Sequence, residues 1–239
     1  NPIPDSFAQS SRMYMEQFDL YVSVVERARR AMAGKVEVWL GLECDYFPGH
    51  EAWLAKQLKS APFHHVLGSI HPHLSEYRKE FWTGNVVAFQ EKYFEHLGDA
   101  AETGLFDTIS HPDLVKNIAP SEWQVERVMG AIERCLDRIA ATGTAMELNT
   151  SGLNKSVPEM NPGPAMLKAM AERQIPVVVG ADAHVPERVA DQYEQAFDLL
   201  EAAGYREVHY FLERKRRTVT IAAARESLLK PAGVADGKE

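Results

Sequence analysis

A repeat of short apolar segments, each followed by a longer helical pattern, is the strongest constraint on the fold of this chain. The apolar segments are rich in Val, Ile and Leu and have the length of buried strands. We expect strands at residues 36–43, 65–70, 106–109, 144–148 and 176–180. Strands separated by helices pair in parallel through right-handed crossovers, and continuous apolar strands indicate a sheet covered on both faces. The repeat therefore predicts an α/β fold, either a (β/α) barrel or a doubly wound sheet.

Helix signals fill the segments between these strands. Helices are expected at residues 11–33 and 86–103, from a capping box at Ser121 to Gly143, after Pro164, and from Pro186 to Gly204. A late strand at 207–212 precedes another short strand at 218–221, with the basic run 214–217 as a solvated turn between them. Because no linker breaks the series, we expect one domain over residues 1–230 and a flexible polar tail at 231–239.

Composition excludes several classes of protein. The chain has 239 residues, with 26 basic against 34 acidic side chains and a net charge of −8, which disfavours binding to nucleic acid or an anionic membrane. No apolar run approaches the roughly 18–20 residues of a membrane span. Two cysteines, Cys44 and Cys135, are too few for a disulfide framework, so we expect a cytoplasmic protein with Cys44 buried as a small apolar side chain.

Polar side chains stand where the expected strands end. They are spaced 28 to 40 residues apart, about one strand–helix unit each: Glu43, His71, His111, Glu147 with Asn149, and Asp182 with His184. The carboxyl ends of parallel strands meet at one edge of a sheet, so these side chains are expected to converge. Carboxylate oxygens combined with imidazoles suit Zn, Mn or Fe. The pattern predicts a metal site, with Gly180 leaving room for backbone and metal near Asp182.

The other histidines are expected to have ordinary structural roles. His50, His96 and His209 fall on helical or loop surface patterns, His64 lies near the start of a strand, and His73 is expected in a solvated loop.

The motifs at the strand ends resemble those of the PHP (polymerase and histidinol phosphatase) superfamily, and most closely its histidinol-phosphatase branch. They are Gly-Leu-Glu43, Gly68-Ser-Ile-His71, Ser110-His111-Pro-Asp-Leu, Glu147-Leu-Asn-Thr-Ser-Gly and Gly180-Ala-Asp182-Ala-His184. The resemblance covers about residues 36–205 and implies a distorted, TIM-like (β/α)7 barrel. It also implies two or three divalent metal ions, Zn, Mn or Fe, at the carboxyl ends of the strands.

The resemblance further implies roles for individual residues. Glu43 would be a bridging carboxylate, His71 and His111 imidazole ligands, and Asp182 with His184 the closing ligand pair. The implied reaction is hydrolysis of a phosphate monoester by a metal-bound hydroxide, with L-histidinol phosphate of histidine biosynthesis as the expected substrate. Asp182 could also accept a proton from the attacking water, and Lys155 and Arg78 are candidate contacts for the phosphate.

One feature departs from the family pattern. The family begins with a strand carrying His-x-His and a second strand ending in another His, whereas this chain has no His before His50 and starts at Asn1-Pro2 rather than at Met. We therefore expect the first two βα units to be missing through N-terminal truncation, and this chain to be weak or inactive compared with its parent.

Three other functions stay open at this point. The first is a PHP phosphoesterase acting on a different sugar or nucleotide phosphate, since specificity would lie in loops 72–85 and 152–164. The second is an amidohydrolase-like barrel that cleaves C–N bonds, which the acidic Glu43 and the Asp182-x-His184 ending disfavour. The third is a catalytically impaired metal-binding module.

Overall fold

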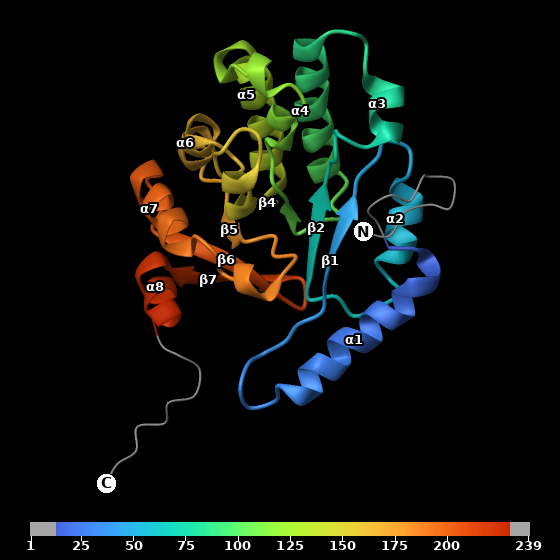
Figure 1. Ribbon diagram of the computed structural model, residues 1–239, viewed down its shortest axis with the longest axis vertical. Coiled ribbons are helices and arrows are strands. Elements are labelled where there is room, and N and C mark those ends of the chain that lie inside the picture. The colour runs from blue at the N-terminus through green and yellow to red at the C-terminus, as the bar shows by residue number, and fades with distance from the viewer. Residues whose placement is uncertain (1–12, 230–239) are drawn as a thin grey trace.

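A five-stranded parallel sheet forms the centre of the computed structural model, which describes residues 13–229 (Figure 1). Its strands are β1 (Gly41–Asp45), β2 (His65–Ser69), β3 (Thr108–Ile109), β4 (Ala145–Asn149) and β5 (Val177–Gly180). They are hydrogen-bonded in the order β1-β2-β3-β4-β5, all parallel. A doubly wound sheet reverses its strand order at a switch point, whereas barrel winding adds each strand beside the previous one. The sequential order therefore shows the barrel type of winding and excludes the doubly wound sheet.

Helices connect the strands and surround the sheet (Figure 1). The α-helices are α1 (Phe18–Ala31), α2 (Glu51–Gln57), α3 (Ser75–Phe81), α4 (Val86–Glu102), α5 (Val125–Thr142), α6 (Pro164–Glu172), α7 (Tyr193–Ala203) and α8 (Ile221–Leu229). Five short 3-10 turns are η1 (Met15–Gln17), η2 (Leu114–Asn117), η3 (Pro120–Glu122), η4 (Thr150–Asn154) and η5 (Pro186–Arg188). One main hydrophobic cluster contains buried side chains from Phe18 to Ile221. Within the described residues, no helix combines the length and apolarity needed to cross a membrane.

Two of the expected helix boundaries are confirmed in detail. Asn85 caps α4, and its side chain accepts a hydrogen bond of 3.0 Å from the amide of Ala88. Gly143 ends α5 in the left-handed conformation, with φ 72°, which costs a glycine little.

Other boundaries differ from the expectation. The predicted helix start at Ser121 is wrong: Pro120 begins a separate 3-10 turn, Trp123 is extended, and α5 starts at Val125 without a side-chain cap. Residues 186–204 likewise form two elements, because the positive φ of Ala190 and Gln192 separates η5 from α7. The first strand was predicted from residue 36 but begins at Gly41.

An antiparallel hairpin of β6 (Glu207–Leu212) and β7 (Lys215–Thr220) packs beside β5. The basic run predicted as a turn belongs largely to β7, so that prediction is wrong for residues 215–217. Of the basic run, only Arg214 lies in the turn, where its guanidinium donates to the carbonyl of Leu105 (2.7 Å) and pairs with Asp107, the residue before β3. The hairpin is thereby fastened to the amino-terminal end of the sheet. The tail predicted at 231–239 lies outside the described residues.

Candidate metal centre

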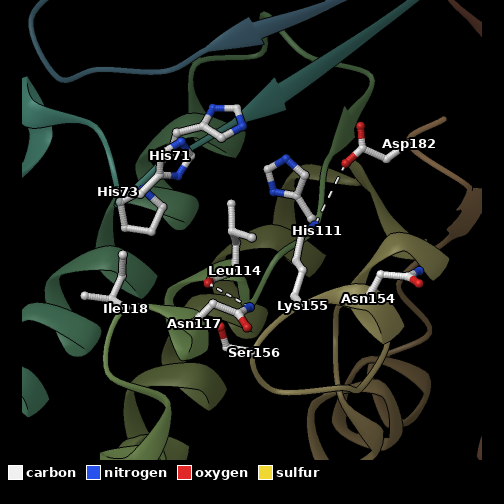
Figure 2. Close-up of a pocket in the computed structure, with 11 residues that line it drawn as sticks. His71, His73, His111, Leu114, Asn117, Ile118, Asn154, Lys155, Ser156 and Asp182 are labelled. Atoms are coloured by element: carbon white, nitrogen blue, oxygen red, sulfur yellow. Dashed lines mark hydrogen bonds and ion pairs between the residues drawn. The ribbon is translucent and has the colours of Figure 1, made fainter. Parts of the chain in front are cut away.

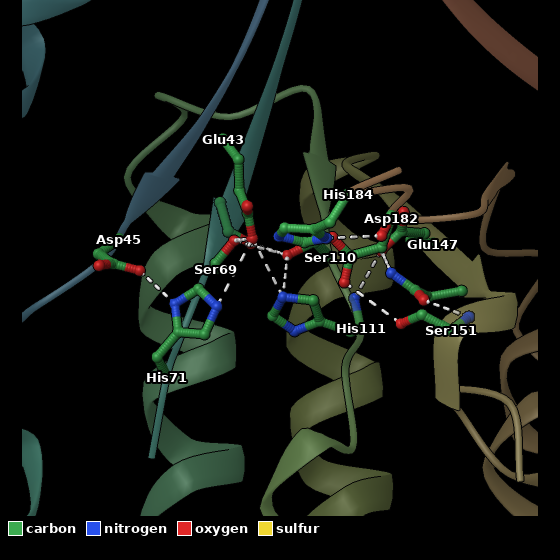
Figure 3. A network of polar contacts seen from close by, with 12 residues as sticks. Glu43, Asp45, Ser69, His71, Ser110, His111, Glu147, Ser151, Asp182 and His184 are labelled. Carbon is green, nitrogen blue, oxygen red and sulfur yellow. Dashed lines mark hydrogen bonds and ion pairs between the residues drawn. The ribbon is translucent and has the colours of Figure 1, made fainter. Parts of the chain in front are cut away.

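Three of the predicted ligands meet at the carboxyl ends of neighbouring strands. Glu43 lies on β1, while His71 and His111 follow β2 and β3. One carboxylate oxygen and one ring nitrogen from each histidine all lie within 4.8 Å of one another (Figure 3). The parallel register carries Glu43 opposite Leu67 and Leu67 opposite Thr108, which brings the three strand ends to one edge of the sheet. The predicted convergence is therefore present for these three residues.

The spacing of these donor atoms suits a small divalent ion. Glu43 Oε1 lies 3.1 Å from His111 Nε2 and 3.7 Å from His71 Nε2. Tetrahedral zinc with bonds of about 2.0–2.1 Å holds its donors about 3.3–3.5 Å apart, so both separations are close to the required value. One carboxylate and two imidazoles are also a donor set that zinc uses in enzymes. The residues present thus fit a metal ion of this type.

A second carboxylate orients the first histidine. Asp45 follows Glu43 by two residues on β1, so both side chains leave the same face of the strand. The Asp45 carboxylate contacts Nδ1 of His71, whereas Nε2 of that ring faces Glu43. A carboxylate on Nδ1 holds the proton there and leaves the lone pair of Nε2 for a metal. The sequence reasoning missed Asp45, although the period-two alternation of β1 would have indicated it.

Electrostatics within the cluster favour the charged forms of both Glu43 and His111. Burial raises the pKa of Glu43, but the hydrogen bond and charge of His111, followed by the charge of His71, outweigh burial and hold that pKa well below its usual range. For His111, burial lowers the pKa, but the hydrogen bond and charge of Glu43 raise it above its ordinary value. A metal ion at this position would replace the proton that His111 shares with Glu43.

Serine hydroxyls complete the contacts around Glu43. Ser69, at the end of β2, donates to Glu43 Oε1, and its hydroxyl lies 2.7 Å from that of Ser110. Both serines are buried; Ser69 holds the Glu43 carboxylate directly, and Ser110 contacts the hydroxyl of Ser69. These two residues were part of the quoted motifs but had no assigned role.

Glu147 is a buried carboxylate that contacts the backbone of His111. It lies in the middle of β4, where burial raises its pKa, and its Oε2 accepts hydrogen bonds from the amide of His111 (2.8 Å) and from Asn149 (3.0 Å). A Cβ on Gly180 of the neighbouring strand would lie only 1.9 Å from Glu147 Oε1. Gly180 therefore leaves room for this carboxylate, which differs from the expected role of admitting a metal.

The remaining pair of predicted ligands is arranged differently. Asp182 follows β5 with φ 48°, and its carboxylate accepts from Ser151 Oγ at 3.2 Å. His184 turns its Nδ1 to the carbonyl of Asp182 (2.9 Å), and its side chain is 86% exposed. The three-donor cluster found among the described residues does not include either residue. Their roles as metal ligands stay predictions.

A pocket of about 440 Å³ opens beside the cluster (Figure 2). Its lining contains His71, His73, His111, Leu114, Asn117, Ile118, Asn154, Lys155, Ser156 and Asp182, together with Pro72. Imidazoles and Asp182 line one part, and Leu114 and Ile118 provide apolar surface. His73, expected to be a solvated loop residue, is exposed and lies at this pocket with its ring 5.4 Å from that of His71. The pocket can hold a small polar molecule against the metal-binding donors.

The two predicted phosphate contacts are placed differently. Lys155 lines the pocket, donates to Ser151 Oγ (2.8 Å), and has Nζ 3.9 Å from Asp182 Oδ2, while burial lowers its pKa. Arg78 is exposed on α3, with its guanidinium 5.8 Å from the centre of the Trp82 ring. Of the two, Lys155 is the cation that lies within reach of a ligand in this pocket.

The chain is similar to known proteins of one family. A family model for the PHP domain matches residues 5–151. A protein of Deinococcus radiodurans described as a probable histidinol-phosphatase is 32% identical over 216 residues, covering 87% of this chain and 81% of that protein. Histidinol-phosphatase of Bacillus subtilis is 24% identical over 221 residues, with 81% of this chain and 82% of the relative covered.

A solved structure has the same fold. The crystal structure of histidinol phosphate phosphatase from Lactococcus lactis, complexed with zinc, L-histidinol and phosphate, superimposes with a TM-score of 0.71. The two chains are 17% identical, and the match covers 83% of this chain and 79% of the other. This likeness confirms the predicted PHP-type α/β fold.

Proposed function

Because this chain belongs to the PHP domain family, we propose that it is a metal-dependent phosphatase whose substrate is L-histidinol phosphate. The observation that carries the proposal is the cluster of Glu43, His71 and His111 beside a pocket that also contains a lysine. The relatives named as histidinol-phosphatases support the choice of substrate.

The residues of the cluster and the pocket have separate roles in the proposed hydrolysis. Glu43, His71 and His111 would hold a divalent metal ion. When bound there, the ion supplies positive charge opposite the phosphoryl oxygens and lowers the pKa of a water molecule. Lys155 binds a phosphate oxygen by charge-assisted hydrogen bonds, and Asp182 accepts a proton from the attacking water. The new bond joins the water oxygen to phosphorus and the ester P–O bond breaks. The alkoxide that leaves takes up one proton from solvent, so that water and ester give histidinol and phosphate.

The number and identity of the metal ions belong to the same proposal. Zn, Mn and Fe all accept mixed oxygen and imidazole ligands. Asp182 and His184 follow β5 and are the proposed ligands for a second ion, in keeping with two or three ions per site. Their side chains would have to turn toward the cluster to do so, since His184 now faces outward.

Two broader features complete the proposal. One main hydrophobic cluster extends over the described residues, which supports a single catalytic domain at residues 1–230. Cys44 and Cys135 are both buried and unpaired, which supports a reducing compartment such as the cytoplasm.

A panel of phosphate monoesters tests the function. Purified protein loaded with Zn or Mn is assayed for phosphate release from L-histidinol phosphate, a sugar phosphate and a nucleoside monophosphate. We expect the highest kcat/KM for L-histidinol phosphate, and its loss by at least about 100-fold in Glu43→Gln, which keeps the size of the side chain but removes its charge. A higher kcat/KM for another ester would assign a different substrate, and equal rates in Glu43→Gln would contradict the assigned metal site.

A further inference from the structure

Lys116 is a lysine with no exposed surface, and its ammonium group lies behind the wall of the substrate pocket. The side chain belongs to η2, directly after the His111-Pro112-Asp113 motif. Its Nζ donates to Asp113 Oδ2 at 3.0 Å and to the carbonyl oxygen of Met160 at 2.8 Å. The carboxylate of Glu159, an exposed residue of the later loop, lies 3.6 Å from the same Nζ. Burying a charge is costly unless the group is paired and fully hydrogen-bonded, so this lysine needs these partners.

Asp113 extends the same contacts to the loop that precedes α6. Its Oδ1 accepts from the side chain of Asn161, and its Oδ2 accepts from the amide of Gly163 at 2.8 Å. Asn161 in turn exchanges two backbone hydrogen bonds with Asn149 at the end of β4, of 2.7 and 3.0 Å. We call Asp113, Lys116, Met160 and Asn161 the Lys116 network.

The Lys116 network joins the two segments that form one wall of the pocket. Leu114 and Asn117, on either side of Lys116 in η2, line the pocket, and so do Lys155 and Ser156 of the later loop (Figure 2). A further hydrogen bond joins these two segments: Asn117 Oδ1 accepts from the amide of Val157 at 2.9 Å. The position of Lys155 relative to the His111 segment therefore depends on contacts made through η2.

Since Lys116 lies outside the pocket lining, it acts on substrate through other residues. We propose that Lys116 is a positioning residue, which holds the loop 155–161 so that Lys155 can bind the phosphate of the substrate. This inference rests on the proposed function. An apolar side chain would fill the same space without a buried charge and is often at least as stable, so the ion pair here is assigned to the arrangement of the loop and not to stability.

The test must keep the protein folded. Lys116→Met alone leaves the Asp113 carboxylate buried without its cation and is strongly destabilising. The double variant Asp113→Asn/Lys116→Met removes the two buried charges and leaves the Glu159 carboxylate, which is 45% exposed, in contact with solvent. The side-chain amide oxygen introduced at position 113 can still accept from Gly163. Lys168→Met on α6, an exposed position, is the matched control for loss of a lysine charge.

Three measurements follow on the folded double variant. Amide hydrogen exchange at residues 155–161 should become about tenfold faster than in the wild type while exchange in α5 is unchanged. KM for the phosphate ester, or the Kd for inorganic phosphate on the zinc-loaded protein, should rise about tenfold, whereas the Kd for zinc stays within about twofold. In a Lys155→Ala background the double variant should add no further increase in KM.

The results distinguish failure of the positioning role of Lys116 from failure of the proposed phosphatase function. Unchanged KM in the double variant, or an effect that adds fully to that of Lys155→Ala, would show that Lys116 has a merely structural role. If the wild type neither hydrolyses phosphate esters nor binds phosphate, the proposed function is wrong and the positioning role is rejected with it.

Discussion

Asp45 shows how much of the metal site depends on residues that would not touch the metal. Its carboxylate is the partner of His71 Nδ1 and determines which ring nitrogen faces Glu43. Without this contact the imidazole is free to take the other tautomer or to rotate about its side-chain bonds.

We therefore expect Asp45→Asn to weaken zinc binding by about 10- to 100-fold, because the amide orients the ring less firmly. Isothermal titration calorimetry with zinc measures the effect. Asp137→Asn is the control, since that carboxylate is exposed and pairs with Arg173 away from the site. Equal zinc affinity in Asp45→Asn and in the control would contradict the orienting role.

Gly180 offers a second test at the level of one residue. Gly180→Ala places a methyl group against the Glu147 carboxylate and should destabilise the protein by about 1–3 kcal/mol. Gly130→Ala in the middle of α5 meets only the end of Arg134 at 3.5 Å and should stabilise it by about 0.5–1 kcal/mol. Urea unfolding of both variants checks the contrast, and a loss no larger in Gly180→Ala than in Gly130→Ala would refute the predicted clash.

At the scale of elements, His96 connects α3 to α4. It was expected on a surface pattern, but it is buried on α4, and its Nδ1 lies 2.8 Å from the hydroxyl of Tyr77 on α3. Burial lowers its pKa to about 4, below the ordinary value of 6.5. The folded protein therefore holds His96 neutral where the unfolded chain would already be protonated.

The sign of the pH dependence follows from this difference. Protons bind the unfolded state more tightly, so the contribution of His96 is fully present above pH 6.5 and is lost as the pH falls toward 4. Between pH 7.5 and 5 it amounts to at most about 2 kcal/mol. We expect His96→Gln to lose less stability than the wild type over this range, as measured by urea unfolding at both pH values. Burial also lowers the pKa of His65 to about 4, so the variant should retain part of the dependence. Identical losses in the two proteins would show that His96 does not titrate on unfolding.

Sequence patterns predicted the elements better than their ends. The buried strands of Val, Ile and Leu and the caps at Asn85 and Gly143 stand where expected, because each depends on local chemistry. The capping-box pattern at Ser121 did not start a helix, since the chain there turns first around Pro120. Such choices between competing local signals are made by packing with distant segments, which one sequence does not reveal.

At the scale of the whole molecule, the order of the strands determines which side chains meet at the site. The repeat of strand and helix predicted that Glu43, His71 and His111 would meet at one edge, and sequential parallel pairing brings them there. The same reasoning placed Asp182 and His184 in the set, but their arrangement depends on the backbone after β5, with its positive φ at Asp182. A net charge of −8 is compatible with an anionic substrate because Lys155 and a bound metal would supply local positive charge.

The central claim, that Glu43, His71 and His111 form a metal site, is tested most directly by the zinc content of the purified protein after loading and dialysis. Mass spectrometry of the metal should find stoichiometric zinc in the wild type and little in the folded variant Glu43→Gln/His71→Asn/His111→Asn. Equal zinc in the two proteins, or no zinc retained by the wild type, would contradict the assignment.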